Sequence, residues 1–406
     1  MDKKRIIFTI AFIIVTIALG YLLYRVFFAK EKVPTEVPIG VGLPPGVLPS
    51  AEEGVITPGV TPRPGVLPTA EELAYEYTGP VFDDYEPYPI KTLVEAPILD
   101  PKINRAGIAN FYNQSDGKFY RLDSDGKPQT LSDEVFYNVE AVTWSPTKNE
   151  SIIEYPDGSN IYYNFDTGQQ STLPKHWEEF SFSPLGDKIA SKSMGLAEEN
   201  RWLVTSDPEG KNVSLIEPMG NNADRVTMDW SPNKQVVALS RTGEALGADR
   251  QEVLFVGLHG ENFRSMIIEG RDFREKWSPT GQKMLYSVYS IRNNFQPELW
   301  IVNAEGDNIG SGRKLLNLAT WADKCTFADD RFVYCAVPSE TKMGAGLAPG
   351  LTDYTDDLLY KIDTKTGIKK EIPLDGYHTI DELFIGEDNT LFFTDKNQIG
   401  LFNMPL

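Results

Sequence analysis

The 406-residue chain has little cysteine, little histidine and few basic residues: two Cys, three His, and 39 Lys and Arg against 58 Asp and Glu. Two cysteines exclude a disulfide-framework fold and a cysteine-rich zinc module. Three histidines leave little material for His-based metal or acid–base chemistry. The net charge of −19 argues against a DNA- or RNA-binding protein, because phosphates require a basic surface.

Catalytic signatures are also missing from the sequence. It contains no Gly-x-Ser-x-Gly elbow, no P-loop, no His-Glu-x-x-His and no Cys-x-x-Cys. We therefore expect no cofactor and no enzymatic activity. Paired carboxylates for glycoside hydrolysis stay open, because the sequence does not tell which Asp and Glu side chains share a site.

The one long apolar run lies near the N-terminus. Residues 6–24 are uncharged and mainly apolar, and as a helix they would span roughly 28 Å, close to the hydrocarbon thickness of a bilayer. We expect residues 6–28 to be a transmembrane signal anchor, with the leader 1–5 in the cytoplasm and the remainder outside. A signal peptide cleaved near Gly20 is the alternative, but the apolar run continues beyond that position.

Residues 29–74 are expected to form a Pro-rich, disordered stalk. Nine of the 40 residues from 33 to 72 are Pro, and a nine-residue segment beginning at Pro45 recurs almost unchanged at Pro64. Such a segment cannot bury a core and has few backbone donors, so an extended chain is predicted. A peptide ligand for a proline-binding partner is the alternative interpretation.

A short motif recurs through residues 75–406, which we expect to fold as one domain. In it an apolar residue precedes Ser-Pro, a turn and a short apolar run. The complete copies begin at Trp144, Phe182, Trp230 and Trp277, and the degenerate ones at Leu99, Phe327 and Ile385. Successive copies lie 38 to 58 residues apart, the size of a four-stranded propeller blade. The spacing predicts an all-β, seven-bladed β-propeller of antiparallel blades, in which Trp144, Phe182, Trp230, Trp277 and Phe327 are structural.

A second series of apolar strands also counts to seven. It includes Ile161–Phe165 and Leu299–Val302, and most members precede a Gly-containing turn that suits a tight hairpin. The last repeat ends at Leu406 with room for three strands. We expect a segment within 75–92 to supply the missing outer strand, because an open sheet edge invites aggregation.

Two copies of the motif carry a resemblance to a known family. Phe182-Ser183-Pro184-Leu185-Gly186-Asp187 and Trp277-Ser278-Pro279-Thr280-Gly281-Gln282 resemble the repeat of TolB-type, WD-repeat-like β-propellers. The same repeat occurs in the propellers of prolyl-oligopeptidase-like enzymes. The resemblance covers about residues 95–405 and implies the fold rather than a site. We expect neither the α/β domain of the first family nor the hydrolase domain of the second in these residues.

Loop lengths indicate where a partner would bind. In a four-stranded blade the first and third hairpin turns share one face, and the middle loop and the inter-blade connection share the other. The first turns are short, and long middle loops are expected at 193–200, 242–251, 289–298 and 338–357, so that all the extra length lies on one face. Binding surfaces usually lie on such loops.

We therefore expect a non-catalytic, extracytoplasmic protein-binding propeller that contacts another envelope or surface protein through this face. The expected partner-binding residues are Asp353, Tyr354, Asp356 and Asp357. Drift of unconstrained loops is the alternative reading of their length. The alternative function is a carbohydrate-binding or polysaccharide-degrading propeller: a lectin, a glycosidase or a lyase.

The remaining candidates are metal and disulfide sites. Asp83-Asp84, Asp329-Asp330 and Asp356-Asp357 are the candidate Ca²⁺ ligands, but none has the spacing of a calcium loop, so solvated turns are expected. His176, His259 and His378 are expected to be ordinary surface residues.

Cys325 and Cys335 flank a short hairpin turn, where paired Cβ atoms come near disulfide distance. An oxidising compartment would permit a bridge. Two small buried apolar side chains are the alternative.

Overall fold

The computed structural model describes residues 87–406, except residues 105, 124, 245, 248, 262 and 387. They belong to the second of the two units into which the chain divides, Phe82–Leu406. The expected leader 1–5, anchor 6–28 and stalk 29–74 lie outside the described residues. Within the described range, no helix has the length and apolar character needed to cross a membrane.

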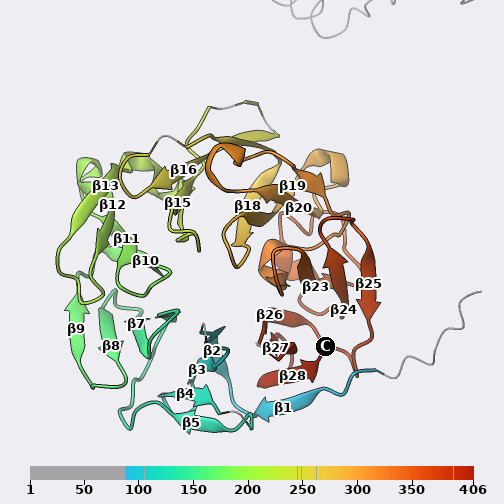
Figure 1. The fold of residues 1–406 in the computed structure, drawn as a ribbon, viewed down its shortest axis with the longest axis horizontal. Helices are drawn as coiled ribbons and strands as arrows, with labels where there is room; N and C mark the ends of the chain where they lie inside the picture. Colours follow the sequence, from blue (N-terminus) through green and yellow to red (C-terminus); the bar gives the residue numbers. More distant parts are fainter. Residues whose placement is uncertain are drawn as a thin grey trace, which may run out of the picture. The chain divides into compact units, whose positions relative to one another are not determined.

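The described residues form seven four-stranded sheets arranged around a central axis (Figure 1). Every pairing within the sheets is antiparallel. In six of the sheets consecutive strands are neighbours, so each blade is an up-and-down meander whose first strand is innermost. This confirms the predicted seven-bladed propeller.

The strands follow one another from blade to blade. Blades 1 to 3 consist of β2 (Ile98–Ile103), β3 (Ala109–Asn113), β4 (Lys118–Leu122), β5 (Pro128–Thr130), β6 (Ala141–Trp144), β7 (Glu150–Glu154), β8 (Asn160–Asn164), β9 (Gln170–Leu173), β10 (Trp177–Phe182), β11 (Ile189–Met194), β12 (Arg201–Ser206) and β13 (Ser214–Pro218). Blades 4 and 5 consist of β14 (Val226–Met228), β15 (Val236–Ser240), β16 (Arg250–Gly257), β17 (Met266–Glu269), β18 (Arg271–Trp277), β19 (Lys283–Tyr289), β20 (Pro297–Asn303) and β21 (Lys314–Leu315). Blades 6 and 7 consist of β22 (Cys325–Phe327), β23 (Phe332–Pro338), β24 (Asp357–Asp363), β25 (Lys369–Ile372), β26 (Ile380–Ile385), β27 (Thr390–Asp395), β28 (Leu401–Pro405) and β1 (Lys91–Val94).

The helical segments of the described residues are all short 3-10 turns in the loops. They are η1 (Glu198–Asn200), η2 (Gly220–Arg225), η3 (Ile291–Asn293), η4 (Gly306–Asn308), η5 (Ala322–Lys324) and η6 (Pro349–Thr352).

The Ser-Pro motif has a local physical role at the end of the inner strand. The serine side chain is buried and closes the turn: Ser231 Oγ accepts a hydrogen bond from Val236 N at 2.9 Å, and Ser278 Oγ accepts one from Lys283 N at 3.1 Å. The preceding aromatic side chain points into the core. The five aromatic residues assigned a structural role, Trp144, Phe182, Trp230, Trp277 and Phe327, are all buried.

The first degenerate copy of the motif is an exception. Leu99-Asp100-Pro101 was predicted to mark the first turn, but it lies inside β2, at a bulge where Asp100 has a φ of 45°. The turn follows later and is closed by a hydrogen bond from Asn104 N to Ile108 O at 2.9 Å. The prediction was wrong because prolines occur both at bulges and at turns, and the amino-acid sequence around Pro101 does not distinguish the two.

The core is divided among the junctions between blades. Each pair of neighbouring blades encloses one cluster of buried apolar side chains, and the clusters together run around the whole ring. The cluster between blades 1 and 2 is mainly aromatic, with Phe119 in contact with the rings of Phe136, Trp144 and Phe165. Each sheet is therefore covered on both faces by its neighbours.

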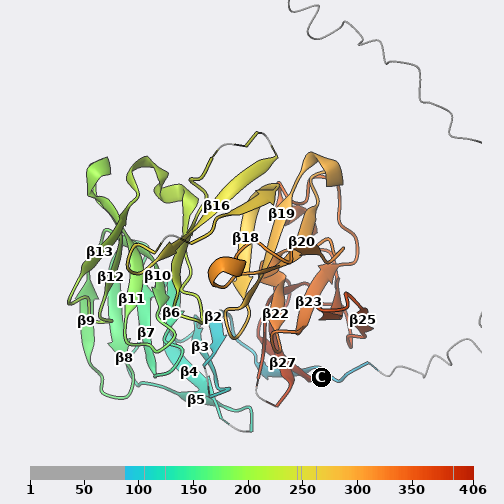
Figure 2. The ribbon, with the colours of Figure 1, turned by 45° about the horizontal axis from the view of Figure 1, so that its top comes forward.

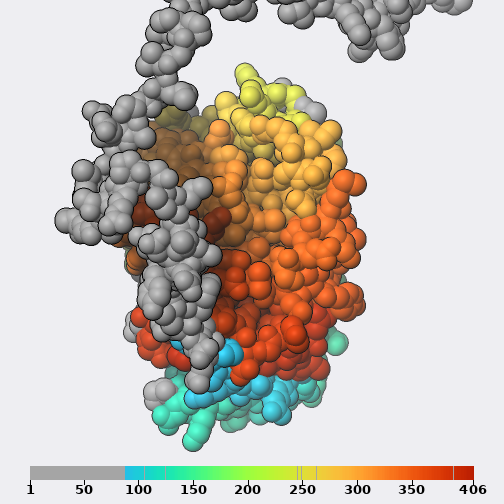
Figure 3. Space-filling model, turned by 90° about the vertical axis from the view of Figure 1, so that its right-hand side faces the viewer, coloured from blue at the N-terminus to red at the C-terminus, as the bar shows by residue number. Residues whose placement is uncertain are grey.

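The ring is closed by the N-terminal end of the described chain. β1 pairs with β28 and forms the outer strand of blade 7, with Lys91 opposite Asn403 and Val94 opposite Leu401. In Figure 3 the blue β1 region lies against the red last blade. β1 overlaps only the end of the predicted range 75–92, most of which lies outside the described residues.

The closure predicts a sensitive glycine. Gly400 has a φ of 138°, and a Cβ there would lie 2.3 Å from the carbonyl oxygen of Val94. We expect Gly400→Ala to lower the free energy of unfolding by clearly more than the roughly 1 kcal/mol of an unfavourable φ alone. Gly344→Ala is the matched control, because Gly344 also has a positive φ, of 86°, with nothing within 4 Å. Equal losses in denaturant unfolding would contradict the steric role of Gly400.

Candidate functional site

The inter-blade connections and the middle loops of the blades form what we call the long-loop face. Its long middle loops are 195–200, 241–249, 290–296 and 339–356, in blades 3 to 6, as predicted. The opposite face also has two long hairpin loops, 258–265 and 304–313, in blades 4 and 5. The prediction that all the extra length lies on one face is therefore wrong.

The 339–356 loop is held by the blades on both sides of it. Toward blade 5, Gly344 N and Gly346 N donate hydrogen bonds to Asn294 O and Phe295 O at 2.9 and 2.7 Å. Toward blade 7, Lys396 Nζ lies 2.6 Å from Asp353 Oδ1. Figure 2 shows this orange loop reaching toward the centre of the ring. The loop is thus a fixed part of the surface.

Exposed apolar side chains gather on the long-loop face. Tyr354 is 90% exposed and Met343 is 74% exposed. Burying either side chain against a partner would be favourable in free energy. The large apolar side chains exposed on this face are Val135, Tyr137, Leu196, Leu246, Ile291, Met343, Leu347, Leu351, Tyr354, Tyr377 and Ile399. The loops of the opposite face expose Leu185, Val213 and Ile368.

The four predicted partner-binding residues have different surroundings. Tyr354 and Asp356 are exposed, and Asp353 is half-buried in its ion pair with Lys396. Asp357 is buried, with 4% of its surface exposed, so its prediction as a partner-binding residue is wrong. Its place at the end of a polar loop conceals that it begins β24 and faces the protein interior.

Asp357 instead forms a buried ion pair with Lys324. Lys324 Nζ lies 2.6 and 2.8 Å from the two carboxylate oxygens, and Ile380 N donates a further hydrogen bond to Oδ2 at 2.7 Å. Burial lowers the pKa of Lys324, and Asp357 opposes that change. The pair joins η5, β24 and β26, and so fixes the end of the 339–356 loop to blades 6 and 7.

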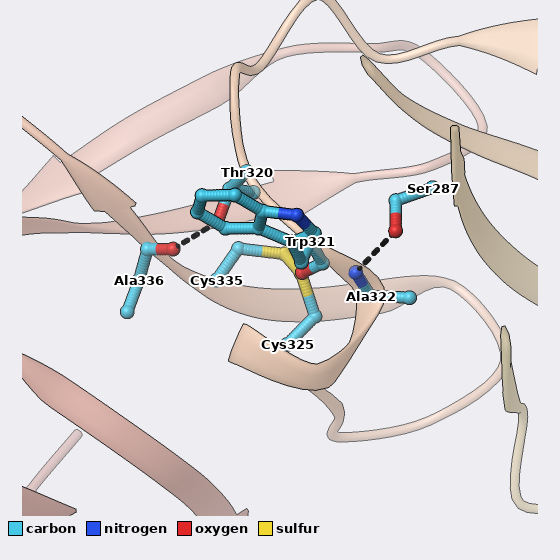
Figure 4. Close-up of a disulfide and its surroundings, with 7 residues drawn as sticks. All are labelled: Ser287, Thr320, Trp321, Ala322, Cys325, Cys335 and Ala336. Carbon is cyan, nitrogen blue, oxygen red and sulfur yellow. Dashed lines mark hydrogen bonds between the residues drawn. A yellow bond between two sulfur atoms is a disulfide. The ribbon is translucent and has the colours of Figure 1, made fainter. Parts of the chain in front are cut away.

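Cys325 and Cys335 face each other on β22 and β23 and are joined by a disulfide, with their Cα atoms 4.1 Å apart (Figure 4). Both cysteines are fully buried. Trp321 lies over the bridge, and Thr320 Oγ1 donates to Ala336 O at 2.6 Å. The disulfide thus links β23 to the first residue of β22, which directly follows η5 and Lys324.

The three histidines are not all at the surface. His176 and His259 are exposed, but His378 is buried, and its Nδ1 lies 3.0 Å from Asp395 Oδ2. Burial alone would raise the pKa of Asp395. The hydrogen bonds from His378 and from backbone amides outweigh this effect, so the pKa of Asp395 lies below its ordinary value. The prediction of a surface histidine is therefore wrong for His378, which packs against Phe393 and Phe402.

The carboxylates of Asp329 and Asp330 have structural partners. Asp329 Oδ1 accepts hydrogen bonds from the backbone of its own turn, and Asp330 Oδ2 accepts one from Thr280 Oγ1 of blade 5 at 2.7 Å. Asp83-Asp84 lies outside the described residues. Among the described side chains, no group of three or more His, Cys, Asp or Glu is placed to hold a metal ion.

Charged side chains of the inner strands influence one another around the axis. Burial, together with the negative charges of Asp229 and Asp323, raises the pKa of Glu275 to about 8. Burial likewise raises the pKa of Asp229 to about 6, against the opposing charges of Lys102 and Lys276. These groups come from blades 1, 4, 5 and 6, and Asp229, Glu275 and Lys276 are half-buried, so the centre of the ring is a crowded, mixed-charge environment.

Sequence reasoning missed the charged residues at the junction of blades 5, 6 and 7. Arg274 of β18 lies 2.8 Å from Asp323, which precedes β22, and Lys396 lies 3.8 Å from Asp381 of β26. No motif links these residues, because they belong to three different blades: Arg274 to blade 5, Asp323 to blade 6, and Asp381 and Lys396 to blade 7. Only the register of the blades brings them together.

The comparisons with known proteins identify the fold. No protein-family model matches the chain, and no curated protein does. An oligogalacturonate lyase from Vibrio parahaemolyticus is similar in structure, with a TM-score of 0.52 and 12% identity over 78% of this chain and 93% of that one. An oligogalacturonate lyase in complex with manganese matches with a TM-score of 0.50 and 12% identity, over 79% of this chain and 93% of that one. The tricorn protease matches with the same TM-score and identity over 79% of this chain, which spans only 34% of that protein.

The Lys324–Asp357 pair predicts strong coupling between two substitutions. Lys324→Met leaves a buried carboxylate without its counter-charge and is expected to cost about 3–5 kcal/mol of unfolding free energy. Lys324→Met combined with Asp357→Asn removes both charges and keeps an acceptor for Ile380 N. We expect the double variant to lose less than the sum of the two single variants, measured by denaturant unfolding. Additive losses would contradict the pairing.

Glu275 predicts a pH dependence of stability. Because its pKa of about 8 in the folded state lies above its ordinary value of 4.5, its contribution to stability is complete below about pH 4.5 and is lost as the pH rises to about 8. We expect Glu275→Gln to raise the thermal midpoint relative to the native chain at pH 8 and to change it little at pH 5. The exposed Glu198→Gln is the control. A constant difference across this range would refute the expectation.

Proposed function

We propose that the propeller is a non-catalytic binding module that holds another protein on its long-loop face. The observation that carries the proposal is the apolar patch of the 339–356 loop, where Met343, Leu347, Leu351 and Tyr354 are 74, 57, 44 and 90% exposed. Leaving such side chains in water forgoes burial free energy, and several large apolar side chains exposed on one loop are typical of an interaction site. The hydrogen bonds to blade 5 and the ion pair to blade 7 hold the patch ready for a partner.

The module is proposed to work outside the cytoplasmic membrane, anchored by residues 6–28 and raised from the bilayer by the stalk 29–74. The apolar run of residues 6–24 supports the anchor. The disulfide between Cys325 and Cys335 supports an oxidising compartment, because structural disulfides rarely persist in the cytosol. Recovery of the full chain in the soluble fraction after an alkaline wash of membranes would contradict the anchor.

Carbohydrate binding is the second candidate, favoured by a separate groove between blades 1 and 2. Tyr137 and Tyr155 line it together with Asn138 and Ser159. Tyr137 is 73% exposed, and exposed aromatic faces beside planar polar groups suit a sugar ring. Binding of the full chain to an arrayed glycan, lost in Tyr137→Ala and kept in Tyr354→Ser, would support this candidate. Binding to no glycan would rule it out.

Photocrosslinking tests the protein-binding proposal. A photoreactive amino acid replaces Met343 or Tyr354 in the full chain in its own cells, and captured proteins are identified by mass spectrometry. We expect the same protein from both positions, because the two side chains share one loop. Leu347→Ser and Tyr354→Ser together are expected to lower the yield at Met343 at least fivefold, since buried interface anchors are worth about 2 kcal/mol or more each.

The matched control places the same crosslinker at Ile368, which is 68% exposed on a loop of the opposite face. Capture of the same protein from Ile368 with equal yield would refute binding through the long-loop face. Absence of any captured protein at Met343 and Tyr354 would refute the module itself.

A further inference from the structure

A pocket opens on the long-loop face where blades 5, 6 and 7 meet. It is lined by six charged side chains from five segments of the chain: Arg274, Asp323, Lys324, Asp353, Asp381 and Lys396. Pro349 and Thr352 of η6 form part of the same wall. The pocket therefore adjoins the 339–356 loop, which carries the exposed apolar patch.

The cations of the pocket are already paired with carboxylates. Lys324 is buried in its bidentate pair with Asp357. Arg274 donates to Asp272 and Asp323 at 2.9 and 2.8 Å. The positive charges of Arg274 and Lys324 are therefore neutralised by carboxylates of the protein itself.

The carboxylates are the more accessible charges. The side chains of Asp323, Asp353 and Asp381 are 51, 40 and 54% exposed, whereas those of Arg274, Lys324 and Lys396 are 31, 8 and 33% exposed. An approaching group therefore meets negative charge first. Asp381 is the least engaged of the three, because its ion pair with Lys396 is long, at 3.8 Å.

The wall of the pocket also includes an aromatic side chain. Trp321 lines it with 4% of its surface exposed, and its Nε1 is buried without an acceptor among the described residues. A buried donor without a partner costs about 1–3 kcal/mol.

We infer that this pocket receives a basic side chain, an arginine in preference to a lysine, from the protein that binds the long-loop face. The inference rests on the proposed function and names the chemistry of the partner. A guanidinium presents several donors in one plane and so pairs with two of the rim carboxylates at once. Apolar partner residues beside that arginine lie on Met343, Leu347, Leu351 and Tyr354.

An acidic or phosphorylated side chain does not suit the pocket. It would meet Asp323, Asp353 and Asp381 before it reached a cation, and the cations would have to leave carboxylates only 2.6 to 2.9 Å away. Removing one member of a close or buried pair leaves an uncompensated charge. The accessible charge of the site therefore selects for a cation.

Peptide selection tests the inference. A phage library of random heptapeptides is panned against the full chain in nanodiscs, and the selected peptides are synthesised and titrated. We expect the peptides to be enriched in arginine beside apolar residues. Asp381→Asn is expected to weaken their binding at least fivefold, Asp381→Lys to weaken it further, and Asp381→Glu to restore most of it.

Asp375→Asn is the matched control, because Asp375 is exposed on the same face but outside the pocket. Equal thermal midpoints for the native chain and Asp381→Asn show that the fold is kept. Peptides that depend on Leu347 and Tyr354 but lack basic residues, or that bind Asp381→Asn normally, would overturn the inference and leave the proposed function standing. Failure of every peptide to depend on Leu347 and Tyr354 would overturn both.

Discussion

The packing of apolar side chains between neighbouring blades is the constraint on which the rest of the structure depends. A four-stranded sheet has two faces, and in this ring each face is covered by the next blade, with one buried cluster at every junction. A missing blade would leave two faces exposed, so the ring is stable only when closed. Closure in turn requires that β1 join the strands from the other end of the chain.

The closed ring explains how the long-loop face acquires a defined shape. The 339–356 loop belongs to blade 6, but its contacts are with Asn294 and Phe295 of blade 5 and Lys396 of blade 7. The packing of the blades fixes the positions of those residues. The loop is therefore held in place by the sheets of blades 5, 6 and 7. The charged pocket arises in the same way, since its members come from strands that only the ring brings together.

Much of the fold could be predicted from the sequence because its signals are local. The Ser-Pro turns are closed by serine side chains within a few residues of the chain, so the motif marks the end of an inner strand at Trp230 and Trp277. In blade 1 the motif at Leu99 did not mark the turn, because a bulge places its proline inside β2. The site could not be predicted in the same way. In the sequence, Asp357 and His378 have the surroundings of loop residues. Their burial depends on the partners Lys324 and Asp395, which come from other segments of the chain.

The entry of the chain through β1 has a mechanical consequence. Just before β1, Tyr88 forms a bridge with Leu374, and β1 itself is bonded to β28 of blade 7 and continues directly into β2 of blade 1. A pull from the N-terminal side therefore loads the seam between the last and the first blade. The Tyr88 bridge, the β1–β28 ladder and the packing of Val94 against Leu401 together resist the opening of the ring.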